Sequence, residues 1–380
     1  MQFRINDNTA NLVIFIIFGL RNNFQYPDLS LILQKRLFNN IMTAQKTNIN
    51  DIAIKTGLSI STVSRVLNGK AEQFRIGKKS QQKINEAAKE LNYVPNKFAA
   101  SLRTGKSNTI ALIIPSLQNP FFADLSSNIN AEIRKYGFTT MISDSDENFE
   151  IEKMELQQMV SRNVDGLIIV PSGNQWDHIK YFYDLGLPII CIDRYFEDLE
   201  LPFVSTDNYE GAYNATKYLI ENGHSNISCI QGVQHSTPNK LRVKGFKNAM
   251  EEAGFHDYIV TGDDFSFQNG YLETKLLFHQ KQIPTAIFTL SNTIAMGCIK
   301  ALKEMNIRIP EDISLITFDE HPYLDYLETP LSCIAQPVND ISKIAVKFLF
   351  LQINKEEGNR NKQVLLKPQM ILKKSVRRIV

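Results

Sequence analysis

The chain has 380 residues, four cysteines and a formal net charge of only +2. The cysteines (Cys191, Cys229, Cys298 and Cys333) lie in or beside apolar stretches without C-x-x-C spacing, so we expect buried free thiols in a reducing cytosol. Charge is strongly segregated. Residues 43–107 hold 12 Lys and Arg against 4 Asp and Glu (+8), whereas residues 108–380 hold 26 against 34 (−8). A basic module beside an acidic one is expected if only the first contacts phosphates, and a generic solvated surface would not usually segregate charge in this way.

Residues 1–41 do not fit the rest of the chain. The apolar run at residues 12–20 is shorter than the about 20 residues of a membrane-spanning helix. It has the length of a signal-peptide apolar region, but Asp7 offsets Arg4 and no small-x-small cleavage site follows. We therefore expect a non-native upstream extension with the true start at Met42, and a membrane anchor is the alternative. Mass spectrometry of the native N-terminus tests whether the protein starts at Met42. A peptide from residues 2–40 would contradict this expectation.

Residues 50–65 predict two short helices joined by a tight turn. Asn48 can cap the first helix and Asp51 suits its first turn. Gly57 stands where that helix ends and the chain reverses, a place that favours positive φ. Ser59 can cap the second helix. The pattern is that of a DNA-binding helix-turn-helix, with an ordinary helical hairpin in a globular core as the alternative.

The second helix would offer small hydroxyls and one Arg from its N-terminal half, which suits a DNA major groove. These residues are Ile60, Ser61, Thr62, Ser64 and Arg65. Residues 80–91 predict a third, amphipathic helix that packs on the first two. Its apolar residues at helical spacing are Ile84, Ala87, Ala88 and Leu91. The third helix favours the DNA-binding interpretation.

A linker is predicted to follow the third helix. Pro95 biases Val94 away from helical geometry, and a short Ala-rich run occupies residues 97–103. We expect this hinge to be disordered without DNA, because so few small or polar residues cannot form a stable isolated helix.

Beyond residue 107, apolar runs of strand length alternate with helical stretches, which favours parallel sheets covered on both faces. The strand-length runs are 109–115, 138–143, 165–171, 188–193, 226–231, 258–262, 285–290 and 313–318, and helical patterns include 121–136, 208–221, 240–252 and 291–305. About 270 residues exceed what one such core usually holds, so two α/β lobes are expected. The cleft between them is then the expected ligand pocket.

As a set, these motifs resemble the lactose-repressor family of bacterial transcription regulators over about residues 47–376. The matching runs are Asp51-Ile52-Ala53, Gly57-Leu58-Ser59, Thr62-Val63-Ser64-Arg65-Val66-Leu67-Asn68, Leu91-Asn92-Tyr93-Val94-Pro95-Asn96 and Ser101-Leu102-Arg103-Thr104-Gly105. The resemblance implies an N-terminal all-α helix-turn-helix domain (47–94), a hinge helix or linker (95–107) and an α/β two-lobed, periplasmic-binding-protein-like effector domain (108–376). Lobe 1 would span about 108–205 and 331–364, and lobe 2 about 206–330 and 365–376.

The resemblance also implies which residues contact DNA: Asn48, Ile60, Ser61, Thr62, Ser64, Arg65, Asn68, Asn96 and Leu102. Arg65 would contact base edges, because Arg is the usual bidentate partner of guanine. Ile60 and Ser61 occupy the positions that choose the operator, with helix packing as the alternative for Ile60. Leu102 resembles a hinge leucine that wedges into the minor groove, and anchoring of the linker on the effector domain is its alternative.

One departure from the family pattern lies at residues 69–77, where the loop is longer than usual. Its Lys70 and Arg75 could reach phosphates, and Gly77 stands where Ser or Thr normally caps the third helix. The departure puts the family's contacts with the DNA backbone in doubt and leaves the helix-turn-helix motif intact.

For the effector, family positions match Phe121, Phe122, Asp193, Arg242, Phe265, Ser291, Asn292 and Asp319. Asp and Arg beside a flat aromatic ring suit a sugar, through hydroxyl hydrogen bonds and ring stacking. Ser291-Asn292 replaces the usual Asn-Asp and Thr317 the usual Gly. The lost carboxylate predicts an effector that is less hydroxyl-rich, or charged. Core packing is the alternative for the two Phe residues, and helix capping for the two Asp residues.

No catalytic or metal-binding motif was found. Gly105-Lys106-Ser107 lacks the Gly that a phosphate-binding loop needs, because that position is Ala100. No G-x-G-x-x-G follows a strand, no G-x-S-x-G occurs, and the six histidines never fall at i, i+3 or i+4. An enzyme would need a catalytic constellation, so this class is not favoured, and no cofactor or metal is expected.

The sequence therefore predicts a cytoplasmic, homodimeric or tetrameric repressor-type transcription regulator without a membrane partner. Its partners would be double-stranded operator DNA and a sugar-like effector, whose binding closes the cleft and shifts the population of DNA-binding states. Two further classes differ in what they lack. A periplasmic sugar-binding protein would have no helix-turn-helix, and a nucleoid-type DNA binder would have no ligand cleft.

Overall fold

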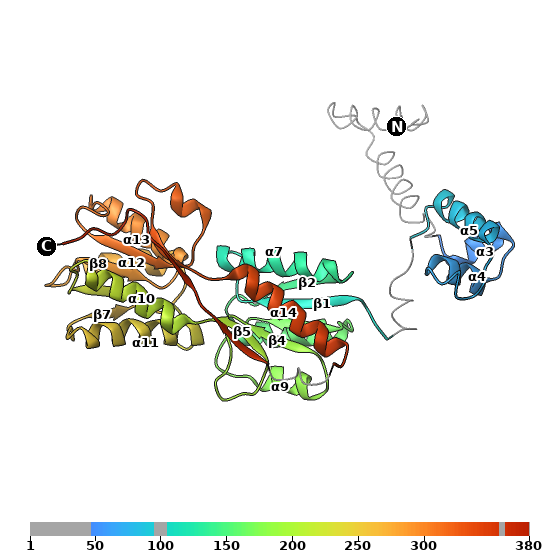
Figure 1. Ribbon diagram of the computed structural model, residues 1–380, viewed down its shortest axis with the longest axis horizontal. Coiled ribbons are helices and arrows are strands. Elements are labelled where there is room, and N and C mark those ends of the chain that lie inside the picture. The colour runs from blue at the N-terminus through green and yellow to red at the C-terminus, as the bar shows by residue number, and fades with distance from the viewer. Residues whose placement is uncertain (1–46, 95–104, 357–361, 380) are drawn as a thin grey trace, which may run out of the picture. The chain divides into compact units, whose positions relative to one another are not determined.

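The computed structural model describes residues 47–94, 105–356 and 362–379. The chain forms two units that divide between Lys97 and Phe98 (Figure 1). The expectations for residues 1–41, for Asn96 and Leu102, and for most of the hinge lie outside the described residues.

The described part of the first unit contains three helices: α3 (Ile49–Thr56), α4 (Ile60–Leu67) and α5 (Lys78–Glu90). The predicted caps of α3 are confirmed, because Asn48 Oδ1 accepts from the backbone N–H of Asp51 and the Asp51 carboxylate accepts from the backbone N–H of Asn48. Gly57 reverses the chain at φ 65°, and the Ser59 hydroxyl accepts from the backbone N–H of Thr62.

The third helix fixes the first two through a small apolar core. Ile52, Val63 and Ile84, one from each helix, are fully buried, and each such side chain contributes about 1.5–3 kcal/mol. Helix α5 starts two residues before the predicted position, and Gly77 caps it without a side-chain hydrogen bond. The helix-turn-helix arrangement is thus stabilised by packing more than by the caps.

The second unit contains two sheets of six strands each. The first has the order β11-β5-β4-β3-β1-β2 and the second the order β12-β10-β9-β8-β6-β7. The first comprises β1 (Thr109–Ile114), β2 (Thr139–Asp144), β3 (Gly166–Ile169), β4 (Ile189–Ile192), β5 (Phe203–Thr206) and β11 (Gln363–Leu366). The second comprises β6 (Ile227–Ile230), β7 (Ile259–Thr261), β8 (Ala286–Thr289), β9 (Ser314–Phe318), β10 (Ser332–Ala335) and β12 (Gln369–Ile371).

Helices cover both faces of each sheet (Figure 1). Around the first sheet these are α7 (Pro120–Lys135), α8 (Phe149–Ser161), α9 (Asp177–Asp184) and α14 (Val338–Ile353). Around the second they are α10 (Asn208–Glu221), α11 (Thr237–Glu252), α12 (Phe267–Leu277) and α13 (Asn292–Glu304), with a 3₁₀ turn at Pro322–Asp325.

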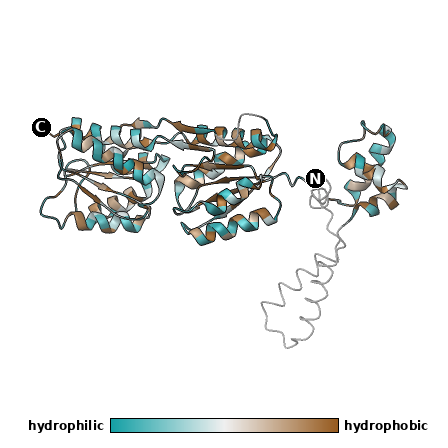
Figure 2. Cartoon of the chain, turned by 90° about the horizontal axis from the view of Figure 1, so that it is seen from below, coloured by the Kyte–Doolittle hydropathy of each residue, from teal (hydrophilic) through white to brown (hydrophobic). Residues whose placement is uncertain are grey.

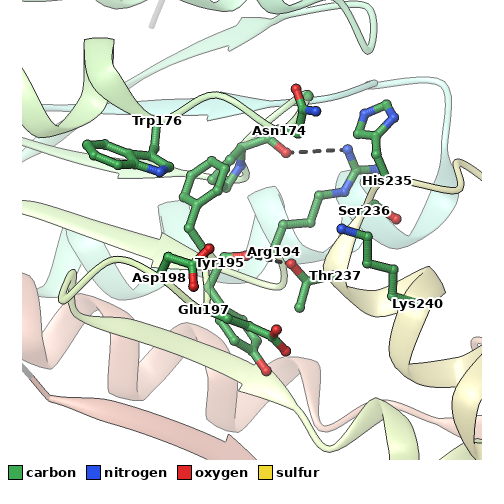
Figure 3. Close-up of a pocket in the computed structure, with 13 residues that line it drawn as sticks. Asn174, Trp176, Arg194, Tyr195, Glu197, Asp198, His235, Ser236, Thr237 and Lys240 are labelled. Carbon is green, nitrogen blue, oxygen red and sulfur yellow. Dashed lines mark hydrogen bonds between the residues drawn. The ribbon is translucent and has the colours of Figure 1, made fainter.

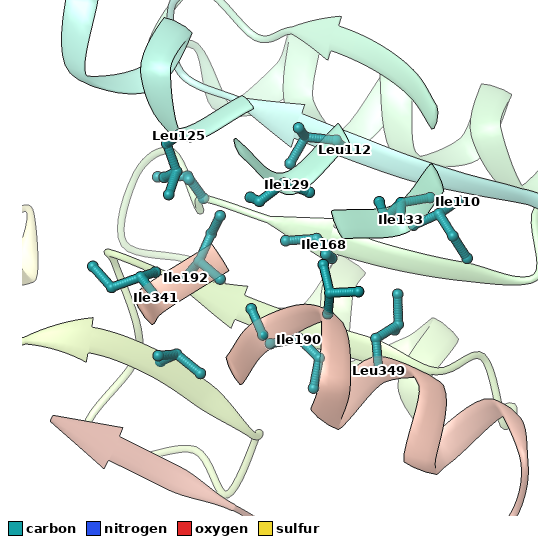
Figure 4. Packing of buried hydrophobic residues seen from close by; sticks show 14 of the residues in the cluster. Ile110, Leu112, Leu125, Ile129, Ile133, Ile168, Ile190, Ile192, Ile341 and Leu349 are labelled. Carbon is teal, nitrogen blue, oxygen red and sulfur yellow. The ribbon is translucent and has the colours of Figure 1, made fainter. Parts of the chain in front are cut away.

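Strand β1 shows why the strands read as continuous apolar runs. Ile110 and Leu112 pack against α7 and α14 in one cluster, shown in Figure 4, whereas Ala111 and Ile113 belong to the cluster on the opposite face. Because both faces are buried, both sets of alternating side chains must be apolar. The hydropathy colouring agrees, with hydrophobic strands inside and hydrophilic outer helix faces (Figure 2). The four cysteines are buried and free, as predicted.

The chain passes between the two sheets three times: from β5 to α10, from β10 to α14 and from β11 to β12. Two of these crossings correct the predicted lobe boundaries. Strand β10 pairs with β9, so residues 332–335 belong to the second lobe, although they were expected in lobe 1. Strand β11 pairs with β5 as far as Leu366 opposite Thr206, so residues 206 and 365–366 belong to the first lobe, although they were expected in lobe 2. The reason is that lobe membership follows long-range strand pairing, which sequence spacing does not specify. Among the described residues, no helix is long and apolar enough to cross a membrane.

Candidate functional site

The start of α4 presents a group of hydroxyls. Ser59 Oγ lies 2.9 Å from Ser61 Oγ and 2.8 Å from Thr62 Oγ1, so one capping residue orders both neighbours. Ile60 is 51% exposed, which disfavours the alternative that it serves helix packing. An exposed apolar side chain beside hydroxyls can contact a thymine methyl and base edges in a major groove.

Two asparagines predicted to contact DNA also hold helix ends. Asn48 caps α3, and Asn68, at the end of α4, donates from Nδ2 to the Ser64 carbonyl at 2.6 Å and to Ser64 Oγ at 3.2 Å. Their side chains are therefore placed by the helices before any ligand arrives.

Arg65 was expected in the N-terminal half of its helix, but α4 ends at Leu67, so Arg65 lies in the last turn. Its side chain is exposed. Its guanidinium carbon lies 4.0 Å from the centroid of the Phe74 ring, which belongs to the loop at residues 69–77. A cation over the face of an aromatic ring is attracted by the quadrupole of the ring.

In the second unit, predicted effector residues follow strands of both sheets. Asp193 follows β4 and Asp319 follows β9, with φ angles of 60° and 70°. Such left-handed backbone is uncommon for residues other than Gly and tends to occur at functional sites. Neither Asp is the N-cap of a described helix, which removes helix capping as their explanation.

Arg242, on α11, lies close enough to both Asp193 and Asp319 to interact with their charges, and it is only 3% exposed. Its Nε donates to Asn208 Oδ1 at 2.8 Å and its Nη1 to the carbonyl of Leu290 at 2.7 Å. Its Nη2 lies 3.9 Å from Asp319 Oδ1. Burial lowers the pKa of Arg242, and the nearby Asp319 opposes that shift.

The carboxylates are buried as deeply as the arginine. Burial raises the pKa of Asp193 to about 6, although Arg242 and the adjacent Arg194 counteract it. Burial also raises the pKa of Asp319, against the effect of Arg242. Asp193 Oδ1 has no hydrogen-bond partner among the described residues. A buried acceptor without a partner is costly unless a ligand supplies the donor.

Two residues that the sequence prediction missed complete this polar group. Gln336 lies in the crossover after β10, where its Nε2 donates to Asp319 Oδ1 at 2.6 Å and its Oε1 accepts from Thr206 Oγ1 at 2.5 Å. Arg194 is 4% exposed and forms a two-bonded ion pair with Glu147, at 2.6 Å for each bond. A polar residue directly after a predicted strand was the available signal for Arg194, whereas β10 itself was not predicted.

The predicted aromatic residues have mixed roles. Phe121 and Phe122, at the start of α7, are 7% and 3% exposed and belong to the core. This agrees with core packing, the alternative that the sequence left open for them. The Arg194 guanidinium carbon nevertheless lies 5.7 Å from the Phe122 ring centroid and 6.0 Å from that of Phe265, in the other lobe. A Cβ at Gly232 would lie 2.3 Å from the Phe265 ring, so only glycine admits this ring position.

Ser291 and Asn292, which replace the usual Asn-Asp pair, have different surroundings. Ser291 Oγ accepts from the backbone N–H of Ile294 and thereby caps α13. Asn292 is fully buried, and its Nδ2 has no partner within the described residues. Asn292 therefore offers a buried donor, where a carboxylate would have offered an acceptor.

A pocket of about 140 Å³ opens between the lobes beside this group (Figure 3). Arg194, Tyr195 and Trp176 line it from the first lobe, and His235 and Lys240 from the second. The Thr237 hydroxyl donates to the Tyr195 carbonyl at 2.5 Å, which ties the lobes together there. None of the predicted effector residues lines this pocket, although Phe122 and Phe265 lie near Arg194, which does. In the described part of the chain, no group of three His, Cys, Asp or Glu residues is arranged to hold a metal ion.

Comparisons with known proteins bear on both units. The family "Bacterial regulatory proteins, lacI family" matches residues 48–96, and "Periplasmic binding proteins and sugar binding domain of LacI family" matches residues 107–367. A ribose operon repressor of Halalkalibacterium halodurans is 34% identical over 310 residues, which cover 82% of this chain and 91% of that protein.

Solved structures show the same similarity. A LacI family transcriptional regulator from Enterococcus faecium with bound ribose is 29% identical, with a TM-score of 0.66 over 72% of this chain and all of that one (100%). The lac repressor dimer, bound to operator and the anti-inducer ONPF, is 22% identical, with a TM-score of 0.79 over 88% of this chain and 100% of that one. The second likeness is one of fold.

Proposed function

Because the chain belongs to the lacI family of bacterial regulatory proteins, we propose that it represses transcription by binding an operator that a small molecule controls. The first unit would bind double-stranded operator DNA through α4, with Arg65, Ile60 and Ser61 reading base edges. The second unit would bind the effector. We place the protein in the cytoplasm and assign it no catalytic role, because the similar proteins are regulators.

The effector we propose is a sugar or a sugar derivative. The observation that carries this proposal is the buried polar group of Asp193, Arg242, Asp319 and Gln336 between two lobes. Carboxylates and a guanidinium form directional hydrogen bonds with vicinal hydroxyls, and flanking rings suit the apolar face of a sugar. The related regulator from Enterococcus faecium binds ribose, which supports the same class here.

Control of DNA binding would follow from contacts between the lobes. The Thr237–Tyr195 and Thr206–Gln336 hydrogen bonds both depend on how the lobes meet. A ligand that binds one lobe arrangement better shifts the population toward it. We propose that this shift acts on a homodimer and changes the affinity of its paired helix-turn-helix units for the two operator half-sites.

The test begins by selecting binding sites for the full chain from random double-stranded DNA. We expect a palindromic site, and a selection without any enriched sequence would point to non-specific binding. A thermal-shift screen of pentoses, hexoses and sugar phosphates then identifies the effector, because a ligand at 100 times its Kd stabilises by about 2.7 kcal/mol. A compound that shifts the melting temperature should also change operator affinity. If no sugar changes either quantity, the proposed effector class is wrong.

A further inference from the structure

The loop at residues 69–77 is held at two points by the core of the first unit. Ala71 is 7% exposed and Ile76 packs partly buried against the same apolar cluster. Between them the backbone forms a hydrogen-bonded turn, with the N–H of Phe74 on the Lys70 carbonyl at 3.2 Å and that of Ile76 on the Ala71 carbonyl at 2.9 Å. The loop therefore presents its middle residues in a defined position.

Phe74 is the large apolar residue among the exposed residues 72–75 of this turn. It is 44% exposed, so it is not part of the apolar core, and its ring instead lies under the Arg65 guanidinium at 4.0 Å. The same loop also bonds to the backbone of Arg65, because the N–H of Lys70 donates to the Arg65 carbonyl at 2.8 Å. The loop thus contacts both the main chain and the side chain of one residue.

Stacking restrains Arg65 without occupying its hydrogen-bond donors. A ring contacts the face of the guanidinium plane, whereas the N–H groups point outward from its edge. Among the described residues, no hydrogen bond or ion pair engages the Arg65 side chain. Its edge is therefore available to the O6 and N7 atoms of a guanine. Rotamer freedom that binding would otherwise remove has already been reduced by the ring.

We propose that Phe74 is a positioning residue for Arg65 and thereby a determinant of operator specificity. The proposal rests on the proposed function through the base-reading role of Arg65. It also gives the long loop a role beyond the phosphate contacts that the sequence predicts for Lys70 and Arg75.

The experiment selects binding sites from random double-stranded DNA with the full chain and with Arg65→Ala, Phe74→Ala, Phe74→Tyr and Gln73→Ala variants. Arg65→Ala should erase the preference at one base pair of each half-site. Phe74→Ala should weaken the preference at that same base pair and lower operator affinity by about two- to fivefold, the factor that an exposed cation–π contact supplies. Phe74→Tyr keeps a ring and should retain the preference. Gln73→Ala, in the same loop, should change neither quantity.

A double-mutant cycle then separates positioning from direct contact with DNA. In the Arg65→Ala background, Phe74→Ala should have no further effect on operator affinity. An undiminished effect there, or an equal loss of preference at every base pair, would overturn the proposal. If Arg65→Ala itself changes no base preference, the base-reading function fails, and this is a different result. Thermal unfolding of each variant excludes a folding defect, and little change is expected because Phe74 is exposed.

Discussion

The face of α4 and the cleft between the lobes both use arginine, but in opposite surroundings. Arg65 is exposed and rests on one aromatic ring. Arg242 is 3% exposed and is bonded to Asn208, to Leu290 and, more loosely, to Asp319. An exposed guanidinium can meet a highly charged polymer at little desolvation cost. A buried one must be satisfied by the protein itself, so the cleft is costly to alter even without a ligand.

The largest effect that sharpens this contrast should come from Arg242→Ala. It would leave Asp319 buried without its cationic neighbour and Asp193 with Arg194 alone. We therefore expect a loss of about 3–5 kcal/mol in the free energy of unfolding. Denaturant unfolding measures this loss, and the response to effector should disappear as well. Arg308→Ala, which removes an exposed ion pair with Asp312, is the control and should lower the free energy of unfolding much less. Equal destabilisation by both variants would show that burial of Arg242 does not make it more important for stability than an exposed arginine.

The next effect concerns Asp193. Its folded-state pKa of about 6 lies above its ordinary value of 3.8, so its stabilising contribution is complete below about pH 4 and is lost as pH rises through 6. Asp193→Asn should therefore stabilise the unliganded protein by about 1–3 kcal/mol at pH 7.5 and have little effect near pH 4. Denaturant unfolding of both proteins between these pH values checks this.

Asp312 provides a control of opposite sign. Hydrogen bonds from Arg308 lower the pKa of Asp312 to about 2, so Asp312→Asn should destabilise the protein at neutral pH, and the difference should vanish as pH falls toward 2. A neutral-pH loss of stability for Asp193→Asn as well would show that its charge is well accommodated in the cleft.

Arg65→Ala should weaken operator binding by about 1–3 kcal/mol and change binding to random DNA much less. The reason is that a guanine contact depends on sequence, whereas a phosphate contact does not. Titration of both DNAs by fluorescence anisotropy measures the two losses. Equal losses would assign Arg65 to the DNA backbone and remove its base-reading role.

Lys70→Ala should give the smallest effect. Lys70 is exposed in the loop beside Arg65, so we expect a modest and nearly equal loss on operator and random DNA. The slope of log affinity against log salt should fall by about 1, because one phosphate contact is removed. A loss confined to the operator would instead give Lys70 a role in base reading.

Local chemistry made much of the fold predictable. The caps at Asn48 and Ser59, the left-handed Gly57 and the doubly buried strands each follow from residue type and short-range spacing. Strand β10 was missed because its Ser-Cys-Ile-Ala sequence shows neither alternation nor a long apolar run. Pairing with β9 determines which sheet β10 joins and therefore where Gln336 lies. No local sequence pattern indicates this pairing.

The candidate site was predictable only as far as residue types allowed. Asp193, Arg242 and Asp319 come together as the resemblance implied, yet their hydrogen bonds to Asn208 and Gln336 depend on tertiary packing. The Phe74 ring under Arg65 lies in a loop that departs from the family pattern, so neither periodicity nor resemblance could indicate it.

The four buried cysteines also allow local opening of each lobe to be measured by chemical labelling. Burial raises the pKa of each thiol, for Cys298 and Cys333 to about 12, so alkylating reagents should react only with molecules whose sheets have opened. Cys191 lies in the first lobe, whereas Cys229, Cys298 and Cys333 lie in the second. Labelling rates followed by peptide mass spectrometry would therefore give the opening free energy of each lobe separately. The same rates with effector present would show which lobe the ligand holds closed.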